Sequence, residues 1–178
     1  MTETPPGTPW TVRLARADEF PALERIEREA GARFAAIPAL ADLPEVMTPA
    51  GALPIALGRD QVWVAVAGDA LVGFAYADLL DDAVHLEELD VLPAWGRRGI
   101  GAALVDAVVA DARRRGLPAV TLTTFRDAPW NAPYYARLGF RVLRDGELGA
   151  GLVALLEHEE RRGLPRALRV AMRREVRA

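Results

Sequence analysis

The stretch from Leu89 to Leu104 reads LDVLPAWGRRGIGAAL, and it joins two different structural patterns. On its N-terminal side, Val84–Leu92 predicts a β-strand. On its C-terminal side, Ile100–Arg115 carries apolar residues at helical spacing and predicts a helix that Gly116 ends. A basic turn with glycines lies between them. The stretch therefore predicts a strand, a tight turn and a helix in immediate succession.

This turn has the properties of an anion-binding loop. The first N–H groups of a helix lack partners within the helix, and the positive end of the helix dipole lies beside them. Gly99 and Gly101 let the backbone approach a ligand closely, while Arg97 and Arg98 add positive charge. The turn predicts a cradle for a phosphate or pyrophosphate group. The simpler interpretation is a glycine-containing turn with solvated arginines.

The other segments alternate between strand and helix patterns. Further strands are predicted at Trp10–Ala15, Gln61–Ala67, Ala70–Leu80, Ala119–Thr124, Phe140–Leu143 and about Leu168–Arg173. Further helices are predicted from Asp18, as the N-cap, to about Phe34, at Pro133–Leu138 and at Gly151–Arg162. The proline-rich segment 37–59 is loop-like, with room for one short helix.

The order of these elements predicts one mixed α/β domain over residues 1–178. The three strands between Gln61 and Leu92 are separated by short turns and predict an antiparallel meander. The unit from Val84 to Thr124 predicts a parallel strand–helix–strand crossover. Residues 1–9 are polar and proline-rich, and we expect a flexible N-terminus there.

The residue types that are missing exclude several kinds of chemistry. The 178 residues contain no cysteine, serine or lysine. Disulfides, a cysteine or serine nucleophile, a lysine Schiff base and a lysine-bearing phosphate loop are therefore excluded. The two histidines, His85 and His158, lack metal-ligand spacing, and no metal site is expected.

Charge and hydropathy indicate where the protein acts. The net charge of −3 argues against a nucleic-acid partner, which usually selects a basic surface. No apolar run approaches the roughly 18 residues that a membrane span needs, and Met1–Pro9 lacks the regions of a signal peptide. We expect a cytoplasmic protein without a membrane partner.

A dinucleotide-binding domain is an alternative for the glycine turn. Its fingerprint needs a third glycine where Leu104 stands, and an acidic residue at the end of the next strand. That strand reads VTLTT over 120–124. The meander upstream also disagrees with a fold that opens with strand–helix–strand. The pattern disfavours this alternative.

Two motifs together resemble the GNAT superfamily of N-acetyltransferases. The segment Arg98-Gly99-Ile100-Gly101 after Val91-Leu92-Pro93 is similar to the family's acetyl-coenzyme A motif, and Asn131–Phe140 (NAPYYARLGF) is similar to its Asn…Tyr-x-x-x-Gly-Phe signature. The resemblance covers about Trp10 to Phe140. It implies a central mixed sheet of about six to seven strands with helices on both faces, and acetyl-coenzyme A as co-substrate.

The resemblance also implies the cofactor contacts. Backbone groups on the strand at Leu89, Asp90 and Val91 would bind the thioester carbonyl and the pantetheine arm. The loop contacts would come from Arg97, Arg98, Gly99, Ile100, Gly101 and Ala102. Gly96 occupies the family's first arginine-or-glutamine position. Asn131 stands four residues before Tyr135 instead of about seven, so it either contacts the cofactor or caps a helix.

For catalysis, the resemblance places Tyr135 as the acid that protonates the leaving thiolate, with Tyr134 as a neighbouring competitor. Glu88 or Glu87 is the candidate base for the amine. His85 is a third candidate, as the only group nearby with an ordinary pKa near neutrality.

The predicted activity is transfer of the acetyl group to a primary amine of a small molecule or peptide, by direct attack in a ternary complex. The alternative is a non-catalytic acyl-coenzyme A sensor. Carboxylates at Asp81, Asp82, Glu87, Glu88 and Asp90 suggest a cationic acceptor. The arginine-rich tail is a solvated face or the edge of a homodimer.

Overall fold

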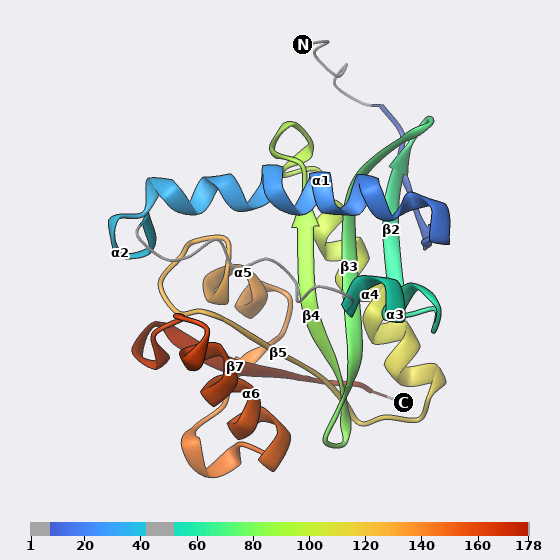
Figure 1. Ribbon diagram of the computed structural model, residues 1–178. Coiled ribbons are helices and arrows are strands. Elements are labelled where there is room, and N and C mark those ends of the chain that lie inside the picture. Colours follow the sequence, from blue (N-terminus) through green and yellow to red (C-terminus); the bar gives the residue numbers. More distant parts are fainter. Residues whose placement is uncertain (1–7, 42–51, 178) are drawn as a thin grey trace. The chain divides into compact units, whose positions relative to one another are not determined.

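The computed structural model describes residues 8–41 and 52–177 of the chain. Figure 1 shows its strands and helices. The strands are β1 Thr11–Leu14, β2 Val62–Ala67, β3 Ala70–Leu80, β4 Ala83–Val91, β5 Ala119–Phe125, β6 Arg141–Val142 and β7 Arg169–Glu175. The helices are α1 Phe20–Gly31, α2 Pro38–Ala41, α3 Ala52–Leu57, α4 Ile100–Arg114, α5 Ala132–Arg137 and α6 Ala150–Arg161.

The strands form a seven-stranded mixed sheet in the order β1-β2-β3-β4-β5-β7-β6. β2 and β3 are antiparallel, while β4 and β5 are parallel and are connected through α4. This arrangement confirms the predicted mixed α/β class, with a meander followed by a strand–helix–strand unit. The short helices α2 and α3 fall within the segment predicted to be loop-like, and residues 42–51 of that segment lie outside the described residues, as do 1–7 of the N-terminus.

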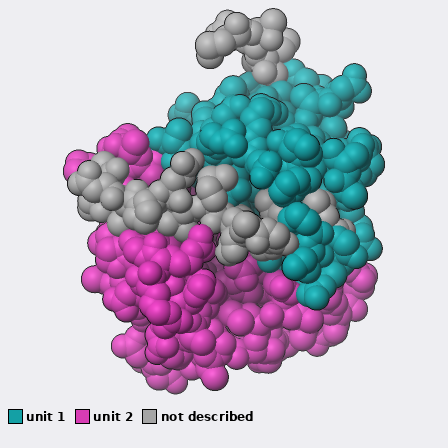
Figure 2. All heavy atoms as spheres, in the orientation of Figure 1, with its two compact units in different colours: residues 1–33, 47–77, 88–107 teal, residues 34–46, 78–87, 108–178 magenta. Residues whose placement is uncertain are grey.

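The chain divides into two compact units, coloured separately in Figure 2. Of the described residues, unit 1 contains 8–33, 52–77 and 88–107, and unit 2 contains 34–41, 78–87 and 108–177. β3, β4 and α4 each contribute residues to both units. The single-domain organisation stays a prediction, and each unit is described by itself below.

In unit 1, helix α1 packs on strands β2 and β3. Leu23 and Ile26 of α1 share a buried cluster with Val62, Val64 and Phe74. Val62 and Val64 are two residues apart, so their side chains point to the same face of the sheet. Burial of this apolar surface fixes α1 across the strands (Figure 1).

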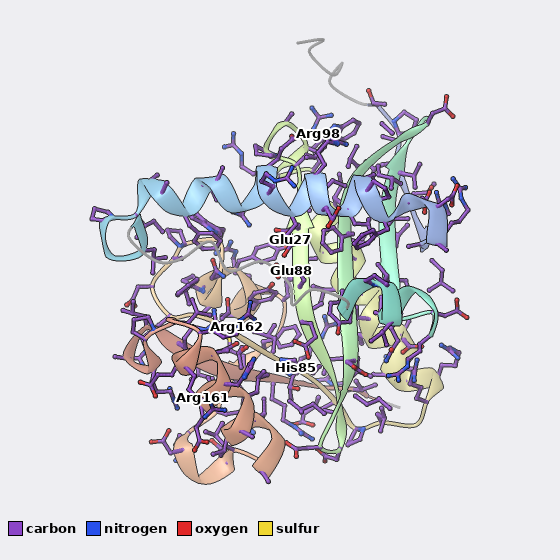
Figure 3. The ribbon with its side chains drawn as sticks, viewed as in Figure 1. Glu27, His85, Glu88, Arg98, Arg161 and Arg162 are labelled. Carbon is purple, nitrogen blue, oxygen red and sulfur yellow. The ribbon has the colours of Figure 1, made fainter. Side chains whose placement is uncertain are left out.

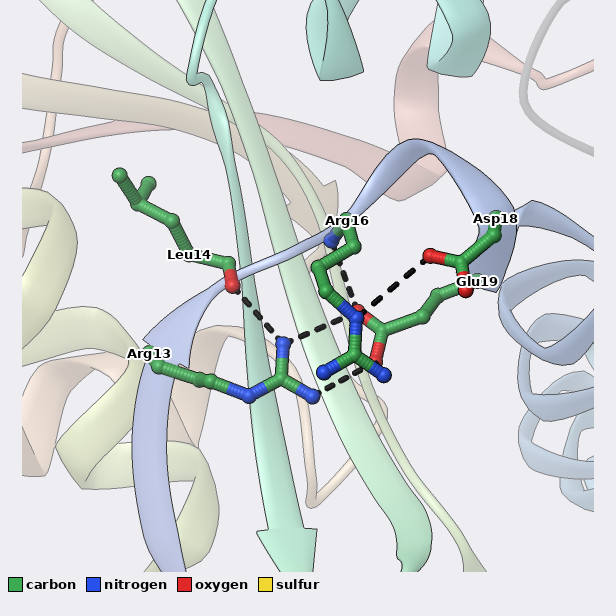
Figure 4. Close-up of polar contacts among 5 residues, drawn as sticks. All are labelled: Arg13, Leu14, Arg16, Asp18 and Glu19. Carbon is green, nitrogen blue, oxygen red and sulfur yellow. Dashed lines mark hydrogen bonds and ion pairs between the residues drawn. The ribbon is translucent and has the colours of Figure 1, made fainter.

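The start of α1 differs from the sequence prediction. Asp18 does not cap the helix; it lies in a 3₁₀ turn, Ala17–Glu19, and α1 begins at Phe20. Glu19 fixes this corner instead, because its carboxylate accepts a hydrogen bond from the backbone N–H of Arg16 (2.8 Å) and from the guanidinium of Arg13 (2.6 and 3.0 Å). Figure 4 shows these contacts. The two charge-assisted hydrogen bonds between Arg13 and Glu19 stabilise this corner more than a helix cap by the more exposed Asp18 would.

In unit 2, the C-terminal strand β7 lies between β5 and β6. It pairs antiparallel with β5 from Ala119↔Glu175 to Phe125↔Arg169, and with β6 at Arg141↔Arg173. α6 packs on this part of the sheet, with Leu152 and Leu156 buried against Ala171 and Leu143. The order of the last strands was not predicted from the sequence.

Candidate active site

The turn that follows β4 in unit 1 has the predicted strand–turn–helix geometry. A 3₁₀ turn at Pro93–Trp95 leads to Gly96, and α4 begins at Ile100. Arg97 and Gly99 have positive φ values of 59° and 81°, which turn the backbone sharply before the helix. The N–H of Ala103 donates to the carbonyl of Gly99 (3.0 Å) as the first helical bond. The N–H groups before Ala103 therefore have no acceptor within the helix, and an anion at the turn can accept hydrogen bonds from them.

The two arginines of this turn have different environments. The guanidinium of Arg98 lies 4.7 Å from the centroid of the buried Trp95 ring, and its Nη1 is buried without a hydrogen-bond partner. Arg97 is exposed. Arg98 is labelled in Figure 3, beside the turn. Burying a guanidinium nitrogen without a hydrogen-bond acceptor costs free energy. An anionic ligand at the turn would supply the acceptor that Arg98 Nη1 lacks. Ile100 is buried in the core, and Gly101 and Ala102 are half-buried in the first turn of α4.

The end of β4 in unit 1 contains the predicted backbone contacts Leu89, Asp90 and Val91. Leu89 and Val91 are half-buried, while Asp90 is buried. The pKa of Asp90 is raised to about 7, chiefly by burial and also by repulsion from Glu27, and the charge of Arg33 opposes both effects. Glu27 is itself buried, on α1. Asp90 at this strand end is therefore protonated more readily than an ordinary aspartate.

The two candidate glutamates of β4 fall in different units. Glu88 is half-buried in unit 1, and Figure 3 labels it on β4. Glu87 is exposed in unit 2, yet its pKa is raised to about 7, chiefly because the surrounding protein limits its hydration and also because Asp78 and Glu159 repel its charge. A carboxyl with a pKa near 7 that reaches solvent suits a general base at neutral pH.

His85 is excluded from that role by its surroundings. It is 1% exposed, and its Nδ1 shares a hydrogen bond of 2.9 Å with Thr121 Oγ1. The pKa of His85 is lowered to about 4, chiefly by burial and also by the charge of Arg169, against the opposing charges of Asp81 and Asp78. The expectation that His85 is the group that titrates near neutrality is therefore wrong. Desolvation lowers the pKa of His85 and raises the pKa of Glu87, so the histidine has the lower pKa of the two.

In unit 2, Asn131 stands at the start of α5 but does not cap it. Its side chain makes no capping hydrogen bond; Nδ2 donates to Thr124 Oγ1 (2.6 Å). Its Oδ1 is buried without a hydrogen-bond partner. The helix-cap interpretation of Asn131 is therefore wrong, and its carbonyl oxygen has room to accept a hydrogen bond from a ligand.

Tyr135 is buried within unit 2 and held by neighbouring rings. Its ring meets Phe140 edge-on, with centroids 5.8 Å apart, and Tyr134 at 5.5 Å. Tyr134 is half-buried, with the guanidinium of Arg137 5.6 Å from its ring centroid. The two adjacent tyrosines therefore differ in environment: Tyr135 is fixed by packing, and Tyr134 lies nearer the surface.

Sequence reasoning missed the groups that set these pKa values. Arg169 donates to the buried carboxylate of Glu159 (2.6 and 3.0 Å), which also accepts a hydrogen bond from Thr123 (2.5 Å). These residues come from the C-terminal tail and β5, far from β4 in sequence. The burial of Glu27 could have been predicted from the sequence, because Glu27 lies four residues after Leu23 on the apolar stripe of α1.

Two structural findings concern metal binding and membrane-spanning helices. Within residues 8–41 and 52–177, no group of three histidine, aspartate or glutamate side chains could hold a metal ion. Over the same described residues, every helix is too short or too polar to cross a bilayer.

Comparison with known proteins identifies the family. A model of the acetyltransferase (GNAT) family matches residues 24–140. This match covers about two thirds of the 178 residues, and the chain belongs to that family. Its class of activity is therefore acyl transfer, with acetyl-coenzyme A as the acyl donor of the family.

Solved structures share the fold at low sequence identity. N-acetylglutamate synthase from Neisseria gonorrhoeae, complexed with coenzyme A and N-acetyl-glutamate, is 16% identical over 95% of this chain, with a TM-score of 0.72. This chain spans 35% of that protein. Rv2747 from Mycobacterium tuberculosis, in complex with CoA and NLQ, is 22% identical, with a TM-score of 0.69 and coverage of 94% and 99% of the two chains.

A third solved structure contains a bisubstrate analogue. Arabidopsis thaliana Naa50, in complex with the bisubstrate analogue CoA-Ac-MVNAL, is 14% identical with a TM-score of 0.64, and the match covers 93% of this chain and 97% of Naa50. At these identities the similarity shows a common fold.

Proposed function

We propose that this protein is an N-acetyltransferase that moves the acetyl group of acetyl-coenzyme A to a primary amine of a small molecule or peptide. The observation that carries the proposal is the turn after β4, where a helix begins beside a buried guanidinium nitrogen of Arg98 that lacks an acceptor. A pyrophosphate supplies the acceptor oxygens that such a turn needs. The family membership of the chain supports the same donor.

Each unit, taken by itself, contains groups that we propose to bind this donor. Arg98, with the backbone of Gly99, Ile100, Gly101 and Ala102, would hold the pyrophosphate, and the exposed Arg97 would add charge. The unpartnered Oδ1 of Asn131 would accept a hydrogen bond from an amide N–H of the pantetheine arm. Acetyl-coenzyme A supplies an acetyl group activated as a thioester.

At the end of β4, a backbone N–H of Leu89, Asp90 or Val91 would stabilise the developing oxyanion. One such donor contributes about 3–4 kcal/mol in other enzymes. The amine attacks the thioester carbon directly, the carbon–sulfur bond breaks, and the electron pair stays on sulfur. Tyr135 would give its proton to that thiolate and recover one from solvent.

We assign removal of the amine proton to Glu87 before Glu88. The assignment rests on the solvent-exposed position of Glu87 and on its pKa of about 7, which leaves a substantial ionised fraction at neutral pH. Glu88 is the alternative base. The net reaction converts an ammonium and a thioester into an amide, a thiol and one proton.

The acceptor class rests on the excess of carboxylates around β4. Asp78, Asp81, Asp82, Glu87 and Glu88 lie on β3, β4 or the turn between them. Negative charge raises the local concentration of cationic amines. A homodimer and an intracellular site of action are parts of the same proposal.

The test is the release of free coenzyme A across a panel of amines, amino acids, peptides and aminoglycosides. We expect turnover with at least one cationic primary amine. In parallel, acetyl-coenzyme A at about 100 times its Kd should stabilise the fold by about 2.7 kcal/mol. Stabilisation without turnover for any amine would favour the acyl-coenzyme A sensor, and stabilisation by NAD alone would contradict the proposal.

A further inference from the structure

Gly73 of β3 lies against the end of β4 at closer range than any other residue type permits. A Cβ atom built on Gly73 would lie 2.7 Å from the carbonyl oxygen of Asp90, 3.1 Å from Val91 Cγ2 and 3.3 Å from Val91 Cα. Real Cβ atoms essentially never lie within 3.0 Å of another heavy atom. The obstacle at Asp90 is backbone, so no side-chain rotation relieves it.

The need for glycine here comes from space and not from backbone conformation. Gly73 is absent from the glycines with positive φ, which in the described residues are Gly68, Gly99, Gly116, Gly139 and Gly163. Any side chain at position 73 must therefore push β4 away from β3 at Asp90 and Val91, or push β3 out of the sheet.

The neighbouring backbone makes this contact a fixed point. The register between β2 and β3 passes from Ala65↔Gly73 to Val66↔Leu71, so Val72 is an extra residue that bulges β3. The carbonyl of this bulged residue accepts a hydrogen bond from the N–H of Leu92 (2.9 Å). The end of β4 is thus held by a hydrogen bond at Val72 and by close packing at Gly73, all within unit 1.

We infer that Gly73 is a positioning residue for the backbone N–H that stabilises the oxyanion at Leu89–Val91; this inference rests on the proposed function. An oxyanion donor has to lie about 2.7–3.1 Å from the position that the oxyanion will occupy, and a 1 Å misplacement can cost about 10²-fold in rate. The glycine sets the position of the strand that carries this donor, because the three heavy atoms nearest to a Cβ at position 73 belong to Asp90 and Val91.

The test is Gly73→Ala, with Gly31→Ala as the matched control. Gly31 is at the C-terminal end of α1 in the same unit, and a Cβ there has no heavy atom within 4 Å. We expect Gly73→Ala to lower kcat at least about 10-fold, while the Kd for coenzyme A changes less than about 3-fold. Gly31→Ala should match the wild type in both quantities. A folded Gly73→Ala protein with wild-type kcat, or with kcat and coenzyme A affinity lost together, would overturn the inference.

If Gly73→Ala does not fold, Val91→Ala tests the same contact from β4. It removes Val91 Cγ2, which lies 3.1 Å from the position of a Cβ at Gly73, and leaves the strand end less constrained. We expect a lower kcat with coenzyme A affinity retained, and an unchanged kcat would overturn the inference. Absence of turnover in the wild-type protein with every amine is a separate outcome; it would contradict the proposed function, and this role for Gly73 with it.

Discussion

His85 Nδ1 and Thr121 Oγ1 share a hydrogen bond of 2.9 Å between the parallel strands β4 and β5, at positions that pair directly in the sheet. Both side chains are buried. The imidazole therefore stays neutral while solvent-exposed histidines gain a proton, and it acts as a polar part of the core. On β4 the pKa values of about 7 belong instead to the carboxyl groups of Glu87 and Asp90.

The first prediction concerns acid stability. The pKa of His85 is lowered to about 4, whereas an unfolded chain protonates histidine near 6.5. The stability that neutral His85 provides is present above pH 6.5 and is lost as the pH falls toward 4. This loss should be on the order of 3 kcal/mol. His85→Gln should flatten the fall in unfolding free energy, measured by urea denaturation at pH 5 and 7. The exposed His158→Gln should leave the wild-type slope, and an identical slope in both variants would refute the assignment.

The second prediction concerns Asp90 and has the opposite sign. Its pKa is raised to about 7, so the folded protein keeps a proton that the unfolded chain loses near pH 4. The stability from this protonated carboxyl is lost as the pH rises toward 7. Asp90→Asn should therefore gain more stability at pH 8 than at pH 5, with a difference of about 2–3 kcal/mol. Asp69→Asn, in an exposed turn, is the control. Equal effects of Asp90→Asn at the two pH values would show that Asp90 is already ionised at pH 5.

The third prediction separates the two candidate bases. With Glu87 as the base, kcat/KM should fall as the pH drops below about 7, because the carboxyl then takes up the proton. Glu87→Gln should remove this acidic limb and lower kcat by about 10²–10⁴-fold. Glu88→Gln should keep the limb. Rates at saturating acceptor separate proton transfer from weaker binding of a cationic amine. The reverse pattern would move the base to Glu88.

The fourth prediction uses the adjacent tyrosines. Tyr135→Phe should lower kcat by about 10²–10⁴-fold with little change in affinity for acetyl-coenzyme A, since the phenol acts on the leaving sulfur. Tyr134→Phe should retain most activity. Steady-state kinetics and calorimetry on the two variants measure both quantities. Full activity in Tyr135→Phe would remove this tyrosine from the mechanism.

The fifth prediction compares the two arginines of the turn. Arg98→Met should weaken coenzyme A binding by about 10- to 100-fold, because a hydrogen bond to a charged group contributes about 1.5–3 kcal/mol. Arg97→Met should weaken it less, since the Arg97 side chain is exposed. Isothermal titration calorimetry with coenzyme A gives both values. Equal losses would indicate a general charge effect without a specific contact by Arg98.

The local elements follow from local sequence. The strand, turn and helix around Gly99 are determined by residues within a few positions of one another: glycine where φ is 81°, apolar spacing over α4, and glycine again at the helix end. The two motifs likewise lie in continuous segments. For this reason the fold class and the loop were predictable. The start of α1 was not predictable in this way, because it depends on the hydrogen bonds that Arg13, outside the helix, donates to Glu19.

The sequence by itself determined the strand–turn–helix unit, the order of most elements and the set of residues available for chemistry. Only the tertiary structure decided how those residues are tuned. It buries His85 against Thr121, sets Glu27 near Asp90, inserts β7 between β5 and β6, and presses Gly73 onto the end of β4. A pKa depends on hydration and on charges contributed by distant segments, and a steric limit depends on the neighbouring strand. The spacing of residues within one chain segment predicts neither the pKa value nor the steric limit.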